Sequence, residues 1–444
     1  MYPADLHIHS RFSRATSRDL DPRQLELWGR YKGLGLIGTG DLTHAAWRQE
    51  LREMLLPAGN GLYILKEELR LPCIAKDTTQ PRFVVSGEIS TIYKREGKTR
   101  KVHHVILLPG LDEADLLARR LEAVGNIHSD GRPILGLDSR DLLEIVLESC
   151  PEAIYIPAHI WTPHFSLFGA FSGFDTVEEC YGDLARYIHA METGLSSDPA
   201  MNRCLSMLDG YQLISSSDAH SPAKLGREAT LLEGEPDYRL LKRAIETGEG
   251  LAGTIEFFPE EGKYHLDGHR ACHCRLEPEE TAAYSGRCPV CGKRITVGVL
   301  SRVRQLADRP EPILRKPYES LIPLPELLGE CLGVGAASKK TEKVYRELLA
   351  RLGPELNILR TVPVETIEAA AGPVVAEAIR RLRQGRVHCL GGYDGEYGTI
   401  RVYEEGEVQE AGGQTSLLDA LGLRAAHDSL HSAHAREDRP ARDG

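Results

Sequence analysis

The sequence predicts an α/β protein with a small cysteine-rich lobe and a mainly helical C-terminal region. Residues 1–258 alternate short apolar runs with stretches of helical periodicity, which is typical of an α/β domain. Cysteines then cluster within residues 259–300, and helical patterns dominate residues 301–410. The 444 residues are expected to form two or three domains, because one domain commonly holds ~100–200 residues.

The predicted strands of the α/β region each end near side chains that can titrate or bind a metal. In a parallel barrel or an open parallel sheet, the carboxyl ends of the strands gather on one face, where sites are commonly built. The predicted strands are residues 5–9, 34–38, 83–86, 102–108, 154–157 and 212–215. Residues 57–82, which are rich in glycine and proline, are expected to leave this core.

The region after the cysteine cluster is predicted to be helical and to end in a hairpin. Apolar residues at four-residue steps predict a helix over 338–352, and a proline near the start with a glycine after the end predicts another over 373–384. Two short runs, 387–390 and 399–403, flank a glycine-rich turn and predict the hairpin. Residues 411–444 have no apolar period and are expected to form a disordered tail.

Composition excludes some classes of protein and leaves others open. The sequence has no apolar run long enough for a membrane span and no basic and apolar signal at its N-terminus. Of the ten cysteines four cluster and six are scattered, which indicates a reduced protein with one metal site, so a cytoplasmic location is expected. The net charge of −11 argues against a nucleic-acid coat or a binder of anionic membranes. Residues 1–258 alone carry a balance of −9, which bound metal ions would offset.

Histidines and carboxylates recur after successive predicted strands. His7 and His9 lie two residues apart on one strand, so both imidazoles can reach one cation. A set of imidazoles and carboxylates without thiols suits Zn²⁺, Mn²⁺ or Fe with open coordination positions, which indicates catalysis. Glu88 can bridge two cations, and such a pair favours phosphoester hydrolysis. Further along the chain the candidates are Asp41, His44, His103, His104, His159, Asp218 and His220.

A second predicted metal site lies in the cysteine cluster. Cys288 and Cys291 form half of a zinc knuckle, with a glycine that allows the tight turn. His269 and Cys272 are predicted to complete the set, and Cys274 is the substitute. Four protein ligands close the coordination sphere, so this zinc is expected to be structural.

The order of the histidines and carboxylates resembles the PHP (polymerase and histidinol phosphatase) superfamily. That resemblance implies a distorted parallel α/β barrel with two or three divalent metal ions (Zn, Mn, Mg or Fe). The implied first set is His7, His9, Glu88 and Asp218; the second is Glu88, His104 and His159, with His103 in reserve; the third is His44 and His220. Two features depart from the superfamily pattern. Residues 11–17 lack the histidine that commonly follows the first pair, and His44 lies two positions later than the pattern expects, so Asp41 is an alternative ligand.

Further stretches resemble the endonuclease Q family of DNA-repair nucleases. They are residues 5–16, 131–138, 194–202 and 217–227, the zinc segment with 295–300 and 306–309, and residues 393–398. The resemblance covers residues 1–409. It implies incision of DNA on the 5′ side of a deaminated base (uracil, hypoxanthine or xanthine) or an abasic site, and it implies damaged DNA as the partner.

The DNA contacts are expected close to the metal ligands. An enzyme that reads a damaged base must usually extrude it, and the aromatic, glycine-rich residues 159–175 are the candidate pocket, with a packed loop over the barrel mouth as the alternative. Positive side chains near the ligands are the candidate backbone contacts, as are Lys339 and Lys340. The predicted DNA-binding residues are Arg11, Arg14, Lys101, Trp161, Phe168, Phe171, Ser172, Lys224 and Arg227.

The predicted catalytic residues are Glu88, Asp198 and Asp218. Asp198 has three open roles: it could bind an ion, orient a water or cap a helix that starts at Pro199. No separate side-chain base is required, because coordination to a cation lowers the pKa of water towards neutrality.

The sequence is also compatible with two other functions. One is a phosphatase of the same superfamily that acts on small phosphoesters, which would leave the zinc lobe and residues 301–410 without a role. The other is a non-catalytic protein that binds DNA lesions, against which the thiol-free ligand set argues. Residues 414–421 are a candidate segment for binding a replication clamp.

Overall fold

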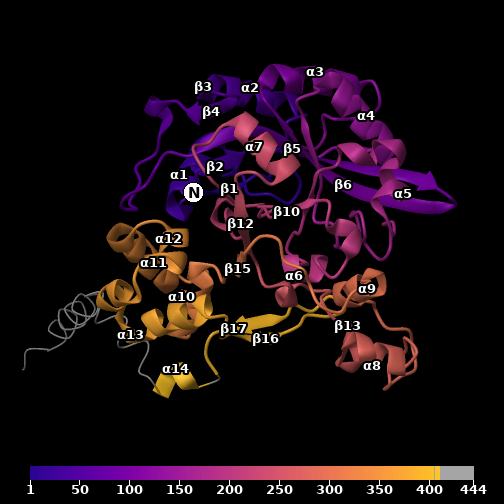
Figure 1. The fold of residues 1–444 in the computed structure, drawn as a ribbon. Helices are drawn as coiled ribbons and strands as arrows, with labels where there is room; N and C mark the ends of the chain where they lie inside the picture. The colour runs from indigo at the N-terminus through magenta and orange to yellow at the C-terminus, as the bar shows by residue number, and fades with distance from the viewer. Residues whose placement is uncertain (405, 411–444) are drawn as a thin grey trace, which may run out of the picture. The chain divides into compact units, whose positions relative to one another are not determined.

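The computed structural model describes residues 1–404 and 406–410, and it divides the chain into two compact units (Figure 1). The first unit comprises Met1–Cys73, Thr79–Leu321 and Cys389–Ile400; the second comprises Ile74–Thr78, Ile322–His388 and the described residues from Arg401 onward. This division differs from the predicted boundaries at 258 and 300. The predicted tail, with the candidate clamp segment, lies outside the described residues.

A mixed β-sheet is the framework of the first unit. β1 (Tyr2–Asp5), β2 (Leu36–Gly38) and β5 (Arg82–Arg95) pair in parallel, and β11 (Ala229–Leu232) and β12 (Leu251–Glu256) follow β1 in antiparallel pairing. The other strands of this sheet are β3 (Leu55–Gly59), β4 (Leu62–Leu65), β6 (Lys98–Leu108), β7 (Ile134–Leu135), β8 (Ile154–Pro157) and β15 (Tyr318–Ser320). β9 (Ala190–Glu192) and β10 (Gln212–Ile214) pair in parallel with each other.

The helices of the first unit begin at residues that suit helix starts. Asp21, Asp138 and Asp237 accept hydrogen bonds from backbone N–H groups in the first turns of α1, α4 and α7, which otherwise lack partners. The helices are α1 (Pro22–Lys32), α2 (Ala45–Met54), α3 (Leu111–Glu122), α4 (Ser139–Ser149), α5 (Val177–Tyr181), α6 (Pro199–Asn202) and α7 (Tyr238–Thr247). Short 3-10 turns are η1 (Glu67–Leu69), η2 (Gly182–Tyr187), η3 (Ser206–Leu208), η4 (Pro222–Lys224), η5 (Pro259–Glu261) and η6 (Arg270–Cys272).

The cysteine-rich lobe and the C-terminal hairpin turn both belong to the first unit. The lobe pairs β13 (Asp267–His269) with β14 (Cys274–Leu276) and adds α8 (Pro278–Ala283) and α9 (Val299–Leu306). The hairpin pairs β16 (His388–Leu390) with β17 (Thr399–Arg401). Tyr393 in its turn forms a β-bridge with Leu266, which explains why residues 389–400 group with the lobe and not with the helices that precede them.

The second unit is helical. It contains α10 (Leu324–Leu332), α11 (Lys339–Leu352), α12 (Glu355–Arg360), α13 (Val364–Arg383) and α14 (Glu407–Glu410). α13 consists of two helical segments joined at Gly372, whose φ of +80° suits glycine, and Pro373 follows. Leu328, Leu348 and Ile379 are among the side chains that form the buried core of this unit.

The α/β class is confirmed, and the details differ in two respects. β1 ends at Asp5, so His7 and His9 follow the strand instead of lying on it. Strand pairing is mixed, because β5–β6 and β11–β12 are antiparallel neighbours, and the parallel barrel stays a prediction. Over the residues that the structure covers, no helix is both long and apolar enough to cross a bilayer.

Candidate active site

Two imidazoles and two carboxylates that are far apart in the sequence converge in the first unit. Nε2 of His9 lies 2.8 Å from Oδ1 of Asp218 and 3.5 Å from Oε2 of Glu88. Nε2 of His7 lies 3.6 Å from the same Asp218 oxygen and 3.7 Å from the same Glu88 oxygen. These four residues form a group that can hold one metal ion.

A second group shares Glu88. Its other oxygen, Oε1, lies 2.5 Å from Nδ1 of His103 and 3.1 Å from Nε2 of His159. The two imidazole nitrogens lie 3.2 Å apart. Each oxygen of the Glu88 carboxylate therefore faces a different group, which is the arrangement of a carboxylate that bridges two cations.

The residues present fit two divalent cations. Nε2 of His7 is buried and has no hydrogen-bond partner, although it faces two carboxylates. A buried polar atom without a partner is costly, and a cation between these atoms would satisfy it. The donor set of nitrogen and oxygen, without thiols, suits Zn²⁺, Mn²⁺ or Fe.

Charge accumulates in this buried site. Burial alone would lower the pKa of His9, but the carboxylates of Asp218, Asp41 and Glu88 outweigh it and raise this pKa to about 9. Burial would raise the pKa of Asp218, but His7 and His9 outweigh it and hold this pKa well below its usual range. The carboxylates are therefore ionised, as metal ligands must be.

Neighbouring residues orient the imidazoles. Glu192 accepts a hydrogen bond from Nδ1 of His7 at 2.9 Å and another from the backbone N–H of His159 at 2.9 Å. Thr162 contacts Nδ1 of His159 at 3.0 Å, which leaves Nε2 of that ring for Glu88. Partners of this kind fix the tautomer and the ring direction of metal-binding histidines.

Backbone strain is concentrated at the site. His159 and Asp218 have φ values of +29° and +48°, a region that residues other than glycine seldom adopt. Asp5 supports the Asp218 loop, because its carboxylate accepts hydrogen bonds from Ser217 and from the backbone N–H of Gly226. A Cβ at Gly194 would lie 2.4 Å from Cβ of His159, so the bend at His159 requires glycine there.

The structure corrects the choice between the adjacent histidines His103 and His104. His103 belongs to the second group, whereas His104 is fully buried on the other face of β6, between Thr91 at 3.2 Å and the Tyr181 hydroxyl at 3.1 Å. Successive side chains of a strand point to opposite faces, so only one of the pair can face Glu88. The apolar residues after His104 mark a buried strand and do not mark a ligand.

The third predicted site is not assembled among the described residues. Asp41 accepts hydrogen bonds from Ser10 and Ser13, and its Oδ1 lies 3.5 Å from Nδ1 of His9, so it orients that ring. His44 stacks on Phe12 with ring centroids 4.4 Å apart. His220 lies beside His9, with centroids 4.5 Å apart, but belongs to neither metal-ligand group.

Asp198 caps a helix. Its carboxylate accepts a hydrogen bond from the backbone N–H of Met201 at 2.8 Å, at the start of α6. Of the three roles, the cap is the one that the described contacts show, and neither active-site metal-ligand group includes Asp198. A catalytic role of Asp198 stays a prediction.

The aromatic segment 159–175 is partly core and partly surface. Trp161 and Phe168 are fully buried and pack against each other, and Trp161 donates a hydrogen bond to Asn202, so the prediction that these two rings contact DNA is corrected. Ser172 is buried against Lys101, whereas Phe171 is 57% exposed and stacks on His164 with centroids 4.7 Å apart.

The predicted phosphate-binding cations have different surroundings. Arg11 forms an ion pair with Glu50 at 2.7 Å, whereas the side chain of Arg14 is 85% exposed. Nζ of Lys101 lies over the ring of Phe165, and Arg227 donates to the backbone of Ser217, next to Asp218. Lys224 ends η4, the turn that follows His220.

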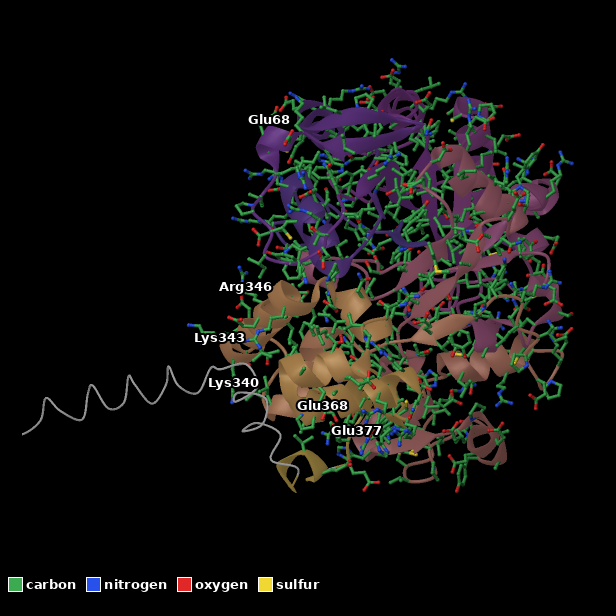
Figure 2. All side chains as sticks on the ribbon, turned by 60° about the vertical axis from the view of Figure 1, so that its left-hand side comes forward. Glu68, Lys340, Lys343, Arg346, Glu368 and Glu377 are labelled. Carbon is green, nitrogen blue, oxygen red and sulfur yellow. The ribbon has the colours of Figure 1, made fainter. Side chains whose placement is uncertain are left out.

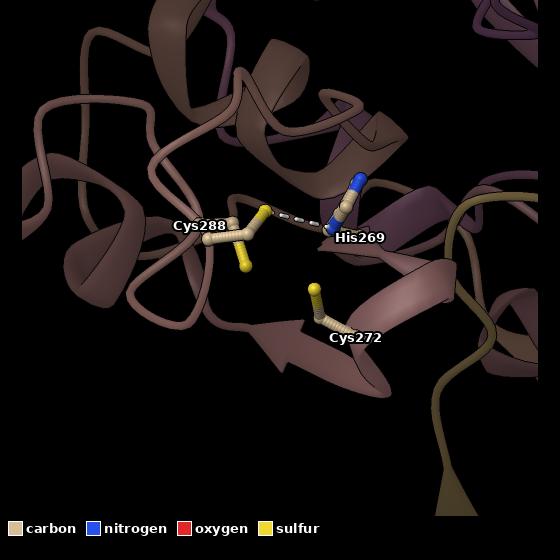
Figure 3. A group of neighbouring side chains, drawn as sticks. His269, Cys272 and Cys288 are labelled. Carbon is tan, nitrogen blue, oxygen red and sulfur yellow. Dashed lines mark hydrogen bonds between the residues drawn. The ribbon is translucent and has the colours of Figure 1, made fainter.

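The cysteine cluster converges as a separate group. His269, Cys272, Cys288 and Cys291 bring their ligand atoms within 4.8 Å of one another (Figure 3). Burial would raise the pKa of the Cys288 thiol, but backbone N–H groups of Cys291 and Val290 outweigh it and lower this pKa to about 6. Cys274 packs with Leu276 and Ile295 in the apolar core of the lobe instead. The four thiol and imidazole donors fit Zn²⁺.

Two residues of the site escaped the sequence analysis. Glu192 ends β9, and nothing in the local sequence separates it from an ordinary surface carboxylate. Nη1 of Arg132 lies 3.0 Å from Oε2 of Glu88, the oxygen that faces His7 and His9. Arg132 had one signal in the sequence: it lies in residues 131–138, which resemble the endonuclease Q family.

The chain is similar in sequence to one family model and to two uncharacterized proteins. The family model of the MJ0043 C-terminal domain matches residues 323–386. The uncharacterized protein MJ0043 of Methanocaldococcus jannaschii is 34% identical over 250 residues, which are 54% of this chain and 31% of that protein. The uncharacterized protein YqxK of Bacillus subtilis is 29% identical over 426 residues, which are 90% of this chain and 98% of that protein.

Two solved structures are similar over most of the chain. The crystal structure of the lesion-specific endonuclease PfuEndoQ from Pyrococcus furiosus gives a TM-score of 0.79 at 30% identity and covers 91% of this chain and 96% of that chain. A structure of endonuclease Q with a 27-mer duplex substrate that carries an abasic lesion at the active site gives 0.77 at 30% identity, over 91% and 97% of the chains. The fold and the site thus define a phosphodiester hydrolase. The chain belongs to the endonuclease Q family.

Proposed function

We propose that this protein is a metal-dependent endodeoxyribonuclease of DNA repair, which incises DNA on the 5′ side of a deaminated base (uracil, hypoxanthine or xanthine) or an abasic site. The observation that carries the proposal is the shared carboxylate: Glu88 presents one oxygen to His7, His9 and Asp218 and the other to His103 and His159. Such paired groups are typical of sites that cleave phosphoesters.

The residues of the two groups would each have a distinct role in metal binding and catalysis. His7, His9 and Asp218 would hold one cation, His103 and His159 a second, and Glu88 both. When bound, two cations activate a water and stabilise the leaving oxygen of a phosphodiester. Arg132 contacts Glu88 at the edge of the group and would contribute positive charge to the scissile phosphate.

The loop that follows His159 is suited to recognising a damaged base. Phe165 packs on His103 with ring centroids 4.8 Å apart, so this loop is attached to the second group. From the same loop, the exposed Phe171 and His164 form a stacked pair. A flat surface of this kind can stack a base that has been extruded from the duplex, and extrusion is easiest where pairing is weak.

The relative solved with an abasic duplex supports DNA as the substrate. The test uses labelled duplexes with a single uracil, hypoxanthine or abasic site, an undamaged duplex, and protein reconstituted with Zn²⁺, Mn²⁺ or Mg²⁺. We expect incision beside the lesion, a much slower reaction on the undamaged duplex, and loss of incision after chelation. Retention of lesion DNA without incision would indicate a binding protein, and hydrolysis of small phosphoesters alone would indicate a phosphatase.

Substitutions in the shared group refine this test. Glu88→Ala and Asp218→Ala are expected to abolish incision, because each removes a carboxylate ligand. Glu148→Ala, which removes an exposed carboxylate of α4, is the matched control and should incise at the wild-type rate. Wild-type rates in both ligand variants would overturn the site assignment.

A further inference from the structure

The second unit carries three exposed positive side chains on one side of α11, with the half-buried Lys340 next to them. These four residues, called here the α11 basic face, are Lys339, Lys340, Lys343 and Arg346, and Figure 2 labels the last three along this helix. The opposite side of α11 is buried in the unit through Thr341, Val344, Tyr345, Leu348 and Leu349. The helix is therefore fixed by its apolar side, and Lys339, Lys343 and Arg346 are exposed on the other side together with Glu342.

Within the described part of the chain these four cations form no ion pair, unlike arginines of the neighbouring α13. Among residues 1–404 and 406–410, no carboxylate oxygen lies within 4.0 Å of any of them. By contrast, Arg381 forms ion pairs with Glu377 and Glu407, and Arg383 donates to three backbone carbonyls. These arginines of α13 link parts of the second unit, whereas the α11 basic face forms no such ion pair with the described residues.

Helix stability does not explain the first two lysines. Lys339 and Lys340 lie in the first turn of α11, behind the Ser338 cap, where the positive end of the helix dipole disfavours cations. The stretch that carries α11 is slightly basic, although the second unit as a whole is not. Residues 322–388 hold ten Lys or Arg and eight Glu and no Asp, in a protein whose net charge is −11. Positive charge collected at a cost to the helix indicates an anionic partner.

We propose that the α11 basic face binds the phosphate backbone of DNA, whether or not a lesion is present. This proposal rests on the function proposed above and adds a second contact region, carried by the helical unit. Lys339, Lys343 and Arg346 span about 10 Å along the helix axis, and one DNA strand places a phosphate every ~3.4 Å, so three cations can reach neighbouring phosphates. Contacts of this kind position a protein on DNA without reading its sequence.

The test measures the salt dependence of binding to an undamaged duplex by fluorescence anisotropy. The triple variant Lys339→Gln/Lys343→Gln/Arg346→Gln should bind more weakly, and the slope of log K against log salt should fall by about 2.7, since each lost phosphate contact removes about 0.9. The matched control is Arg119→Gln/Arg120→Gln/Arg239→Gln, which removes the same charge from exposed positions of α3 and α7. Its slope should equal that of the wild type.

A triple variant that melts at the wild-type temperature and keeps the wild-type slope would overturn this inference. The same proteins are also tested for incision of a uracil duplex. This assay distinguishes failure of the proposed DNA-binding face from failure of the proposed nuclease function. If the wild type incises and the triple variant keeps its salt slope, only the α11 basic face is rejected. If the wild type binds through this face but incises no lesion, the proposed nuclease function is rejected and the DNA-binding face stands.

Discussion

The Glu192 carboxylate accepts a hydrogen bond from Nδ1 of His7 at 2.9 Å, and both side chains are almost completely buried. This contact fixes the imidazole so that Nε2 faces Glu88 and Asp218. Glu192 also accepts from the backbone N–H of His159, so one carboxylate links both metal-ligand groups. Glu192 belongs to neither metal-ligand group, but it orients a histidine of each.

Glu192→Gln is therefore expected to weaken metal binding about 10- to 100-fold, as loss of such an orienting carboxylate commonly does. The metal retained after dialysis against graded chelator, measured by elemental analysis, is the readout. Glu148→Gln, on the surface of α4, is the control and should retain metal like the wild type. Equal retention in the Glu192 variant would mean that His7 needs no orienting partner.

The adjacent histidines should respond differently to the same substitution. His103→Asn is expected to lower the bound metal by one equivalent, because it removes a ligand of the second group. His104→Asn should keep the metal content and lower the melting temperature, because it disturbs buried contacts with Thr91 and Tyr181. The reverse result would restore the original choice of His104.

Arg132 should matter for the chemical step. Arg132→Ala is expected to slow single-turnover incision on the order of 10²-fold, the usual effect of losing one group that stabilises charge in the transition state. Arg132→Lys should recover part of this rate because it keeps the charge. Arg140→Ala, an arginine paired with Asp183 at the surface, serves as the control. A rate within twofold of the wild type for Arg132→Ala would remove it from the mechanism.

The cysteine lobe should bind zinc independently of the active site. Cys288→Ser is expected to lose one equivalent of zinc and to increase proteolysis within residues 259–300, because a structural zinc contributes directly to folding. Cys389→Ser removes an exposed cysteine outside the group and should change neither property. Unchanged zinc content in the Cys288 variant would contradict the predicted zinc site.

A buried pair of carboxylates predicts how stability depends on pH. Glu228, which precedes β11, and Glu256, which ends β12, are fully buried, and burial raises the pKa of Glu256 from 4.5 to about 8. Burial and Glu256 together also raise the pKa of Glu228. The folded state therefore keeps a proton that the unfolded state releases, so stability is present at low pH and is lost as pH rises from about 5 to about 8.

Glu256→Gln should remove much of this dependence, since the amide cannot ionise. The measurement is the melting temperature from pH 5 to pH 9, where the wild type should fall more steeply than the variant. Glu246→Gln, near the end of α7, is the control and should follow the wild type. Parallel curves for Glu256→Gln and the wild type would contradict the assignment.

Local sequence predicted several of the elements and the chemical types of the site. The strand at 154–157 and the helix over 338–352 have clear periodicity and termini, and the structure has them there. The group of His269, Cys272, Cys288 and Cys291 was predicted from its spacing, and the structure brings these four side chains together. His7, His9, Glu88 and Asp218 followed from the order of motifs.

Tertiary structure decided which side chains face the site and which neighbours they contact. Which of His103 and His104 faces Glu88 depends on which face of β6 points to the site, and both faces of that strand are buried. The roles of Trp161, Asp198 and Glu192 depend on neighbours far along the chain or on backbone donors that composition does not reveal. The sequence by itself determined which groups were available for metal chemistry; the fold decided which of them converge, because convergence depends on strand pairing and strand direction.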